Sequence, residues 1–166
     1  MKLIKLYWRI KCFVKKMLLK IIFGKRFKIG KNSHFRKNIS IILEKDAEII
    51  IGDNCFFNRG VSISCMKRVV IGDGTGLGEN VKVYDQDHIF TYPNKSFLRQ
   101  GHTVGEVNIG KNCWVCSNVV FTKNVTVGDN CVIGAGCVIN RDIPPHSFVR
   151  PGNGLIIEPI IYPENK

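Results

Sequence analysis

The sequence predicts an all-β solenoid, a parallel β-helix of about five coils, preceded by an N-terminal amphipathic α-helix. Aliphatic or phenylalanine side chains recur at every sixth position from residue 29 to residue 139, with one long interruption. Glycine and asparagine, the residues that best tolerate a left-handed backbone in turns, stand at fixed places in the same repeat. The first 28 residues differ, because they are basic and their apolar residues follow helical spacing.

The composition is that of one folded domain in a reducing compartment. With 166 residues, of which 45% are hydrophobic and 23% charged, the chain is long enough for a single core plus an appendage. The first apolar stretch is interrupted by lysines and lacks a small-residue cleavage site, which argues against a cleavable signal peptide. We therefore expect a cytoplasmic protein whose seven cysteines are reduced.

The net charge of +12 belongs to one end of the chain. Ten of the 25 basic residues and no acidic residue fall within positions 1–28, and the remainder carries 15 basic and 13 acidic residues. A nucleic-acid-binding domain usually presents a basic stripe with interleaved aromatic residues on its folded surface. The sequence has no such stripe, so we expect no nucleic-acid partner.

Positions 1–28 are predicted to form a basic amphipathic helix. At 100° per residue a basic arc (Lys2, Lys5, Arg9, Lys16 and Lys20) lies opposite an apolar arc (Leu3, Leu6, Ile10, Phe13, Val14, Met17, Leu18 and Ile21). A basic residue every few positions argues against a membrane span. Two interpretations remain open: residues 1–24 lie on the inner face of an anionic cell membrane, or the apolar face packs on the rest of the protein. In the first case Tyr7, Trp8 and Phe13 would lie at the interface.

Six-residue repeats fill positions 29–147, apart from an inserted loop at 84–108, and a tail follows at 148–166. The repeating residues form five groups of three: Ile29, Phe35, Ile41; Ile51, Phe57, Ile63; Ile71, Leu77, Val83; Ile109, Val115, Phe121; and Val127, Ile133, Ile139. A period of six fits neither an α-helix nor an isolated strand. It fits a triangular coil in which each repeat is a short strand and a turn, and three repeats complete one circuit that stacks on the next.

Two further positions of the repeat support this geometry. Asparagine is frequent three residues after the aliphatic residue, at Asn32, Asn54, Asn80, Asn112, Asn118, Asn124 and Asn130, where we expect left-handed turns. A small or thin residue follows, at Ser33, Cys55, Val61, Thr75, Val81, Cys113, Val119, Val125, Cys131 and Cys137. Cys113 and Cys116 have the CxxC spacing of a redox or zinc site. Because Cys113 occupies this inward position, we interpret it as a small hydrophobe.

These residues resemble the hexapeptide-repeat acyltransferases, and within them the galactoside, maltose and capsular-saccharide O-acetyltransferases. The resemblance covers about Ile29 to Ser147 and is most specific over Ile109–Pro145. It implies a left-handed parallel β-helix and a homotrimer with active sites in the grooves between neighbouring prisms. It also implies transfer of an acetyl group from acetyl-CoA to a hydroxyl of a saccharide, either a cell-surface polysaccharide or a lipid-linked precursor, with no metal. Two alternatives stay open: N-acetylation of an amino sugar, and a non-enzymatic scaffold.

The loop at 84–108 is where function is expected, because loops that leave a rigid scaffold often carry the active site. The resemblance implies that His88 is the general base. An imidazole, with a pKa of roughly 6.5, can take the proton of a sugar hydroxyl as the thioester is attacked. Asp85 or Asp87 could orient its ring. His102 is a second candidate base or a substrate contact.

Two other positions match substrate-binding residues of the family. Asn58 matches an asparagine beside the acceptor or thioester, and Trp114 matches a tryptophan that lines the site on the neighbouring chain. The chain departs from the galactoside enzymes in having Cys65 and Met66 where an acidic residue is usual. It also has Arg-Pro-Gly-Asn-Gly at 150–154 in place of Gly-Val-Pro-Ala.

The late repeats are the predicted binding surface for acetyl-CoA. Gly134 and Ala135 would leave a smooth wall for the pantetheine arm, beside Trp114. Arg141, Arg150 or Lys123 could meet the nucleotide phosphates, since guanidinium and ammonium groups suit phosphate oxygens.

Overall fold

A computed structural model describes residues 2–152 and 154–159, except for the side chains of residues 2–6 and 8. The helical orientations predicted for Lys2, Leu3, Lys5, Leu6 and Trp8 therefore lie outside the described residues, as do Asn153 and residues 160–166.

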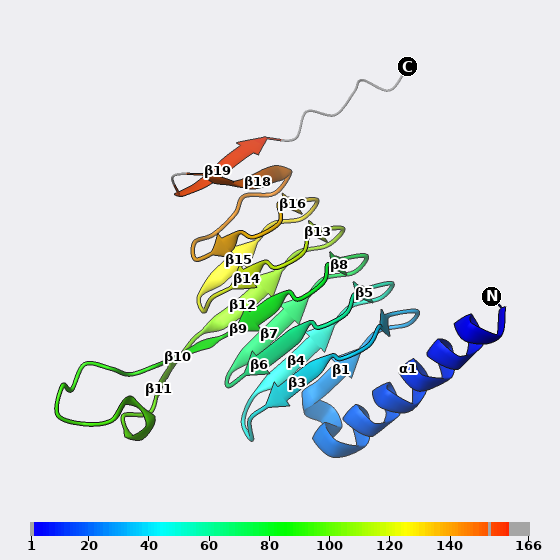
Figure 1. The fold of residues 1–166 in the computed structure, drawn as a ribbon, viewed down its shortest axis with the longest axis horizontal. Helices are drawn as coiled ribbons and strands as arrows, with labels where there is room; N and C mark the ends of the chain where they lie inside the picture. The colour runs from blue at the N-terminus through cyan, green and yellow to red at the C-terminus, as the bar shows by residue number, and fades with distance from the viewer. Residues whose placement is uncertain (1, 153, 160–166) are drawn as a thin grey trace.

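The described chain is a helix followed by a triangular parallel β-solenoid (Figure 1). After α1 (Lys2–Phe23) and a 3-10 turn, η1 (Gly24–Arg26), the strands build three faces. The first face contains β1 (Phe27–Ile29), β4 (Glu48–Ile51), β7 (Arg68–Ile71), β12 (Glu106–Ile109) and β15 (Val125–Val127). The second contains β2 (His34–Phe35), β5 (Phe56–Phe57), β8 (Gly76–Leu77), β13 (Trp114–Val115), β16 (Val132–Ile133) and β18 (Ser147–Gly152). The third contains β3 (Ser40–Leu43), β6 (Ser62–Cys65), β9 (Lys82–Tyr84), β14 (Val120–Phe121) and β17 (Val138–Ile139).

Part of a sixth coil follows the five predicted ones in the described chain. Ile143 bridges to Val127 on the first face, and β18 pairs in parallel with β16 on the second. The strand β19 (Gly154–Pro159) then returns antiparallel to β18. The solenoid is therefore about six turns long, and regular structure continues into the segment predicted as a tail.

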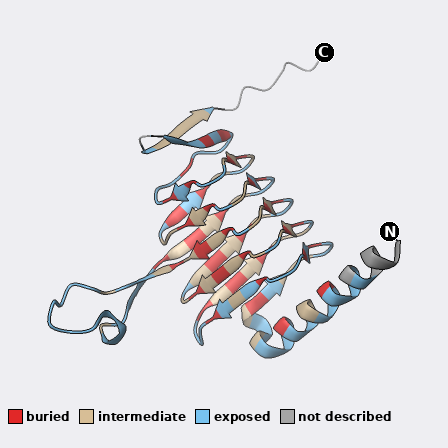
Figure 2. Ribbon diagram, viewed as in Figure 1, coloured by how far each residue is buried: buried red, intermediate tan, exposed pale blue. Residues whose placement is uncertain are grey.

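The core consists of the predicted repeating residues. Thirteen of the fifteen are buried; the other two, Ile29 and Ile41, lie in the first coil and are partly buried against the core. Identical positions stack in register, as in the column of Ile51, Ile71 and Ile109 on the first face. The ten small or thin residues predicted to point inward are all buried. Buried residues accordingly recur at regular intervals along the strands (Figure 2).

Asparagine provides the turns between faces. All seven asparagines that were predicted to adopt left-handed backbone have φ between 53° and 60°. Glycine takes the equivalent place at Gly60, Gly74 and Gly136, with φ of 72°, 70° and 76°. These residues stand mainly at the corners from the first to the second face and from the second to the third, where most other side chains would carry backbone strain.

The helix α1 lies across the N-terminal end of the solenoid (Figure 1). Cys12 and Leu19 are buried there, and Lys15 and Lys16 donate hydrogen bonds to backbone carbonyls of the first coil. The open edge of the first coil is thus covered by a helix, which hides backbone groups that would otherwise be unpaired. No helix among the described residues is both long enough and apolar enough to cross a bilayer.

The apolar face of α1 points away from the solenoid. Its exposed side chains are Tyr7, Ile10, Phe13, Val14, Met17, Leu18, Ile21 and Ile22. The interpretation in which this face packs on the rest of the protein is therefore wrong. The side of the helix that contacts the first coil is instead the one with Cys12, Lys16 and Leu19.

Candidate active site

The insertion leaves the prism at the corner between the third and first faces. It forms an antiparallel hairpin, β10 (Gln86–His88) with β11 (His102–Val104), and its tip contains the 3-10 turn η2 (Phe97–Arg99). The Gly105 N–H donates to the Asp85 carbonyl at 2.7 Å, which closes the base of the hairpin. Residues 86–104, the inserted hairpin, therefore project from a fixed point at the third coil (Figure 1).

Asp85 fixes that point. Its side chain is fully buried, and its carboxylate accepts N–H groups from Met66, Lys67 and Arg68 at 2.8–2.9 Å. The Cys65 thiol donates to it as well, at 3.2 Å. A carboxylate that holds the corner of the preceding coil in this way does not orient His88. The role predicted for Asp85 is therefore wrong. Its position directly after the last residue of β9 was the one feature of the sequence that pointed to a structural role.

His88 and His102 face each other across the hairpin. They are directly paired in its register, and their ring centroids are 4.2 Å apart with an interplanar angle of 41°. The edge of Phe97 meets the His88 ring at a centroid distance of 5.1 Å. Both imidazoles are exposed, so a substrate hydroxyl can reach them. Phe97 was not predicted, because the insertion carries no repeat that would place it.

Asp87 also has a partner other than His88. Its carboxylate lies 3.2 Å from the Lys123 ammonium, which in addition bonds the Thr103 hydroxyl. Lys123, one of the predicted phosphate ligands, thereby ties both strands of the hairpin to the fourth coil. Neither predicted carboxylate contacts the His88 ring; the neighbours of that ring are His102 and Phe97.

The other predicted residues lie at a different edge, the corner between the second and third faces. Asn58, Gly134 and Arg150 occupy equivalent positions there in the second, fifth and sixth coils, and the backbone ladder that joins them passes through Gly78 and Cys116. The Asn58 side-chain oxygen accepts the Arg59 N–H at 2.9 Å. Ala135 is exposed. Trp114, on β13, is 63% exposed beside this corner, which is a large apolar surface for a solvated position.

The two predicted arginines of the late coils are engaged within the chain. Arg150 makes two hydrogen bonds of 2.9 Å to Glu158, whose pKa is lowered mainly by these bonds. Arg141 donates to the Leu155 carbonyl at 2.7 Å. Both side chains therefore hold β19 in place, and binding of phosphates would require them to exchange partners.

The CxxC pair is part of the solenoid wall. The Cys113 thiol is buried and donates to the Gly128 carbonyl at 3.2 Å, and burial raises its pKa to about 11. Burial raises the pKa of Cys116 too. Both thiols are thus kept in the protonated form, which is the opposite of what a redox or metal-binding cysteine needs. The described residues contain no group of three or more potential metal ligands.

Within one chain, the His88–His102 pair lies apart from Asn58, Trp114 and Gly134. The inserted hairpin starts where the third face ends, and Asn58 and Gly134 lie where the third face begins. A strand of the third face separates them in every coil. No hydrogen bond or ring contact within the described residues joins His88 to Asn58 or Trp114.

Comparison with known proteins gives a consistent result. Residues 106–141 match the family model for bacterial transferase hexapeptide (six repeats). The chain is 43% identical over 103 residues to nodulation protein L of Rhizobium meliloti (strain 1021), covering 61% of this chain and 54% of that protein. It is 30% identical to a maltose O-acetyltransferase from Clostridium difficile 630, covering 87% of this chain and 75% of the other, with a TM-score of 0.69. A hexapeptide-repeat acetyltransferase from Vibrio cholerae, complexed with acetyl coenzyme A, has the same fold, with 24% identity, coverage of 86% and 75%, and a TM-score of 0.70.

The solenoid and these matches define a hexapeptide-repeat protein of the bacterial transferase type. The chain belongs to the hexapeptide-repeat acyltransferase family, as the resemblance predicted. It spans about half the length of the curated relatives that it matches, 54% and 49%.

Proposed function

We propose that this chain is an O-acetyltransferase that moves an acetyl group from acetyl-CoA to a saccharide hydroxyl, with His88 as general base. The observation that carries the proposal is the exposed His88–His102 pair on a hairpin that leaves the rigid coil. Family membership and the names of the relatives, an O-acetyltransferase among them, support the reaction type.

In the proposed reaction the inserted hairpin supplies one proton acceptor, the His88 imidazole. The His88 imidazole takes the hydroxyl proton as the acceptor oxygen attacks the thioester carbonyl. The carbon–sulfur bond then breaks, and the leaving thiolate takes the proton from the imidazolium. An acetyl ester and CoA are the products. His102 and Phe97 hold the His88 ring in place of a carboxylate.

The surface at Gly134–Gly136 fits the arm of the donor. Gly136 has open space where a side chain would lie, and Ala135 is exposed. A narrow thioester arm can therefore approach the backbone there, beside Cys116 in the coil below. We assign Trp114 and Asn58 to the substrates on the same edge, and we do not assign Arg141 or Arg150 to the phosphates, since both are engaged.

We further propose a homotrimer in which the hairpin of one chain meets the Asn58 edge of its neighbour. The separation of these two edges within one chain supports this arrangement. Mixing inactive variants provides a sharp test. If each site takes His88 from one chain and Asn58 from the next, mixed trimers of His88→Ala and Asn58→Ala chains recover about a quarter of the wild-type activity by random assortment. Sites formed within single chains would recover nothing.

The reaction itself is tested by thiol release from acetyl-CoA with a panel of sugars. His88→Ala is expected to lower kcat/KM by about 10²-fold or more, the usual worth of a general base. His34→Ala is the matched control, because His34 is also exposed but lies on the first coil against Phe56. Undiminished turnover in His88→Ala would reject the proposed base. An alkali-stable amide product would reassign the chain to N-acetylation of an amino sugar.

The same proposal includes contact of α1 with the inner face of an anionic membrane, where a lipid-linked saccharide precursor would be available. The basic composition of residues 1–28 and the exposed apolar face of α1 support it.

A further inference from the structure

The outward face of α1 is a continuous apolar strip on a charged segment. Ile21, Ile22 and Phe13 are 69%, 65% and 64% exposed. An exposed apolar surface of this extent normally marks a site of contact with a protein or a membrane. The partner must tolerate the positive charge of residues 1–28, which include ten basic residues and no acid.

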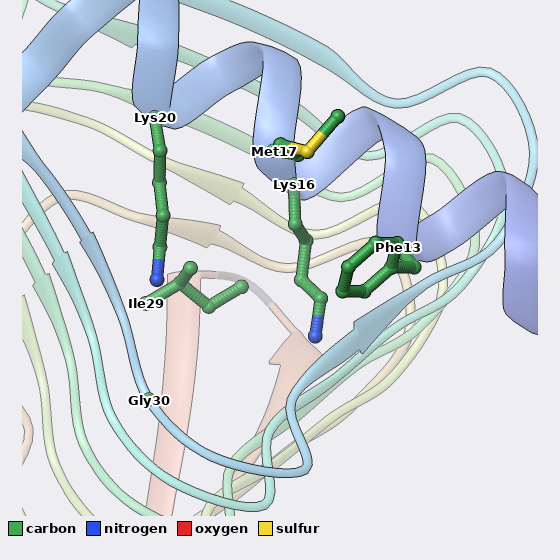
Figure 3. A pocket seen from close by; sticks show the side chains of 6 residues that line it. All are labelled: Phe13, Lys16, Met17, Lys20, Ile29 and Gly30. Atoms are coloured by element: carbon green, nitrogen blue, oxygen red, sulfur yellow. The ribbon is translucent and has the colours of Figure 1, made fainter.

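A groove of about 230 Å³ runs along one flank of this helix, between α1 and the first coil. Its walls are Phe13, Lys16, Met17, Lys20, Ile29 and Gly30 (Figure 3). Lys16 and Lys20 are one helical turn apart, and their side chains extend toward the same space beside Ile29. Phe13 and Met17 make the outer wall apolar and continue into the exposed strip.

The electrostatics of the groove favour an anion. The Lys16 ammonium donates to the Ser33 carbonyl at 2.9 Å, which fixes its position and leaves its charge unneutralised. No carboxylate of the described residues pairs with Lys16 or Lys20. Two ammonium groups beside apolar walls match one chemistry in particular, a phosphate that carries acyl chains.

We infer that α1 seats the N-terminal end of the solenoid on an anionic bilayer, with a lipid phosphate held between Lys16 and Lys20 in this groove. The apolar strip enters the boundary between headgroups and acyl chains, and the flank that bears the groove then lies at the level of the headgroups. The inference deepens the membrane contact proposed above, since it names the ligand and the part of the molecule that faces the bilayer.

This seating also bears on the acceptor. The inserted hairpin leaves the third coil, two coil spacings above the first, and parallel strands are about 4.8 Å apart. With the radius of the helix, of about 5 Å, His88 would lie on the order of 15 Å above α1. A saccharide attached to a lipid headgroup would reach that height, so the inference favours a lipid-linked acceptor over a free polymer.

Binding to vesicles tests the inference. The intact chain is expected to cosediment with vesicles that contain phosphatidylglycerol and not with pure phosphatidylcholine. Ile21→Ser should weaken binding by about tenfold, because it removes buried apolar area. Lys20→Gln should weaken it by about fivefold, the worth of one charge near an anionic surface. Lys111→Gln removes the same charge from a turn of the fourth coil and should leave binding unchanged.

The outcomes separate the alternatives. Equal binding by Lys20→Gln and Lys111→Gln would overturn the phosphate site, and a loss of oligomeric mass in Ile21→Ser with unchanged vesicle binding would make the strip a contact between copies. Inorganic phosphate, as a second probe, is expected to leave the melting temperature unchanged. Stabilisation by phosphate that disappears in Lys20→Gln, without vesicle binding, would make the groove a site for a free anion. Because no acetyl-CoA or acceptor is present, failure here leaves the proposed reaction intact.

Discussion

The carboxylate of Asp85 offers the sharpest test of how the solenoid positions its inserted hairpin. Asp85 lies at the point where the chain leaves the third coil, and its carbonyl accepts the N–H of Gly105 where the chain returns. Its fully buried side chain receives three backbone N–H groups and one thiol from the preceding corner. We predict that Asp85→Asn destabilises the protein and displaces the hairpin.

The magnitude follows from the pattern of donors. An asparagine keeps one oxygen for the N–H groups of Lys67 and Arg68, but its amide nitrogen must then face the Met66 N–H, which is another donor. Loss of one hydrogen bond to a charged group costs about 1.5–3 kcal/mol, and an unpaired buried N–H adds about 1–3 kcal/mol. We expect the free energy of unfolding to fall by about 3–5 kcal/mol in total.

Urea denaturation followed by circular dichroism measures this change, with Asp87→Asn as the control. Asp87 is exposed and pairs only with Lys123 among the described acids and bases, so its substitution should change stability by about 1 kcal/mol or less. If Asp85→Asn were no more destabilising than Asp87→Asn, the account of the corner would be refuted. A second readout is kcat, which should fall in Asp85→Asn because His88 moves with the hairpin.

Three further predictions concern the wall of the solenoid. Thr75→Val should cost about 2 kcal/mol in urea denaturation, because the hydroxyl that bonds the Gly110 carbonyl and the Cys113 N–H is replaced by a methyl group of similar size. Gly134→Ala should cost about 1–3 kcal/mol, since its new Cβ would lie 2.8 Å from the Val149 carbonyl oxygen; an unchanged melting temperature would contradict this. The pKa of Cys113 is raised to about 11 by burial, above the roughly 8.5 of an exposed thiol, so its contribution to stability is complete below about pH 8.5 and is lost as the pH rises toward 11. The urea midpoint should therefore fall between neutral and alkaline pH, and less steeply in Cys113→Ser.

The coil was predictable because a single geometry repeats. Once Ile51 stacks on Ile71, every equivalent residue must do the same, and one period in the sequence places the whole core. The asparagine turns were predictable for the same reason, since the same two corners of successive coils use a left-handed residue. The partial sixth coil was missed because Ile143 follows Ile139 by four residues and not six, which breaks the period before Ile143 and Val149 resume it.

The orientation of α1 could not be read from its helical pattern. An amphipathic helix normally turns its apolar side to the core. Here the first coil presents open carbonyl groups, at Ser33 and Ile39, and the side with Lys15 and Lys16 can satisfy them. Among the described residues, only the first coil has carbonyl groups with no preceding coil to bond them. The periodic pattern of the helix does not indicate that it will lie against that coil.

The candidate site shows the same limit at the level of single residues. His88 and His102 were predicted as separate candidates, and only the register of the hairpin places their rings opposite each other. Asp85 was predicted to serve His88, whereas the nearest unpaired donors were the N–H groups of the coil below it. Long-range pairing inside an insertion has no sequence period, so the partners of these polar groups could not be assigned in advance.

The regularity of the coil also restricts where catalysis can arise. Outward side chains on a face are held at fixed spacing by their neighbours one coil above and below, so they can form a binding wall but cannot move together around a reacting atom. The corner at Asn58 and Gly134 stays within the repeat and supplies such a wall. A base that must reach both a hydroxyl and a thioester has to stand on a segment released from the repeat, which Asp85 and Gly105 provide for His88. The Asn58–Gly134 corner and the hairpin with His88 lie at opposite ends of the third face, and this arrangement favours sites formed where two prisms meet. The mixed-trimer experiment tests directly whether each site is shared between two chains.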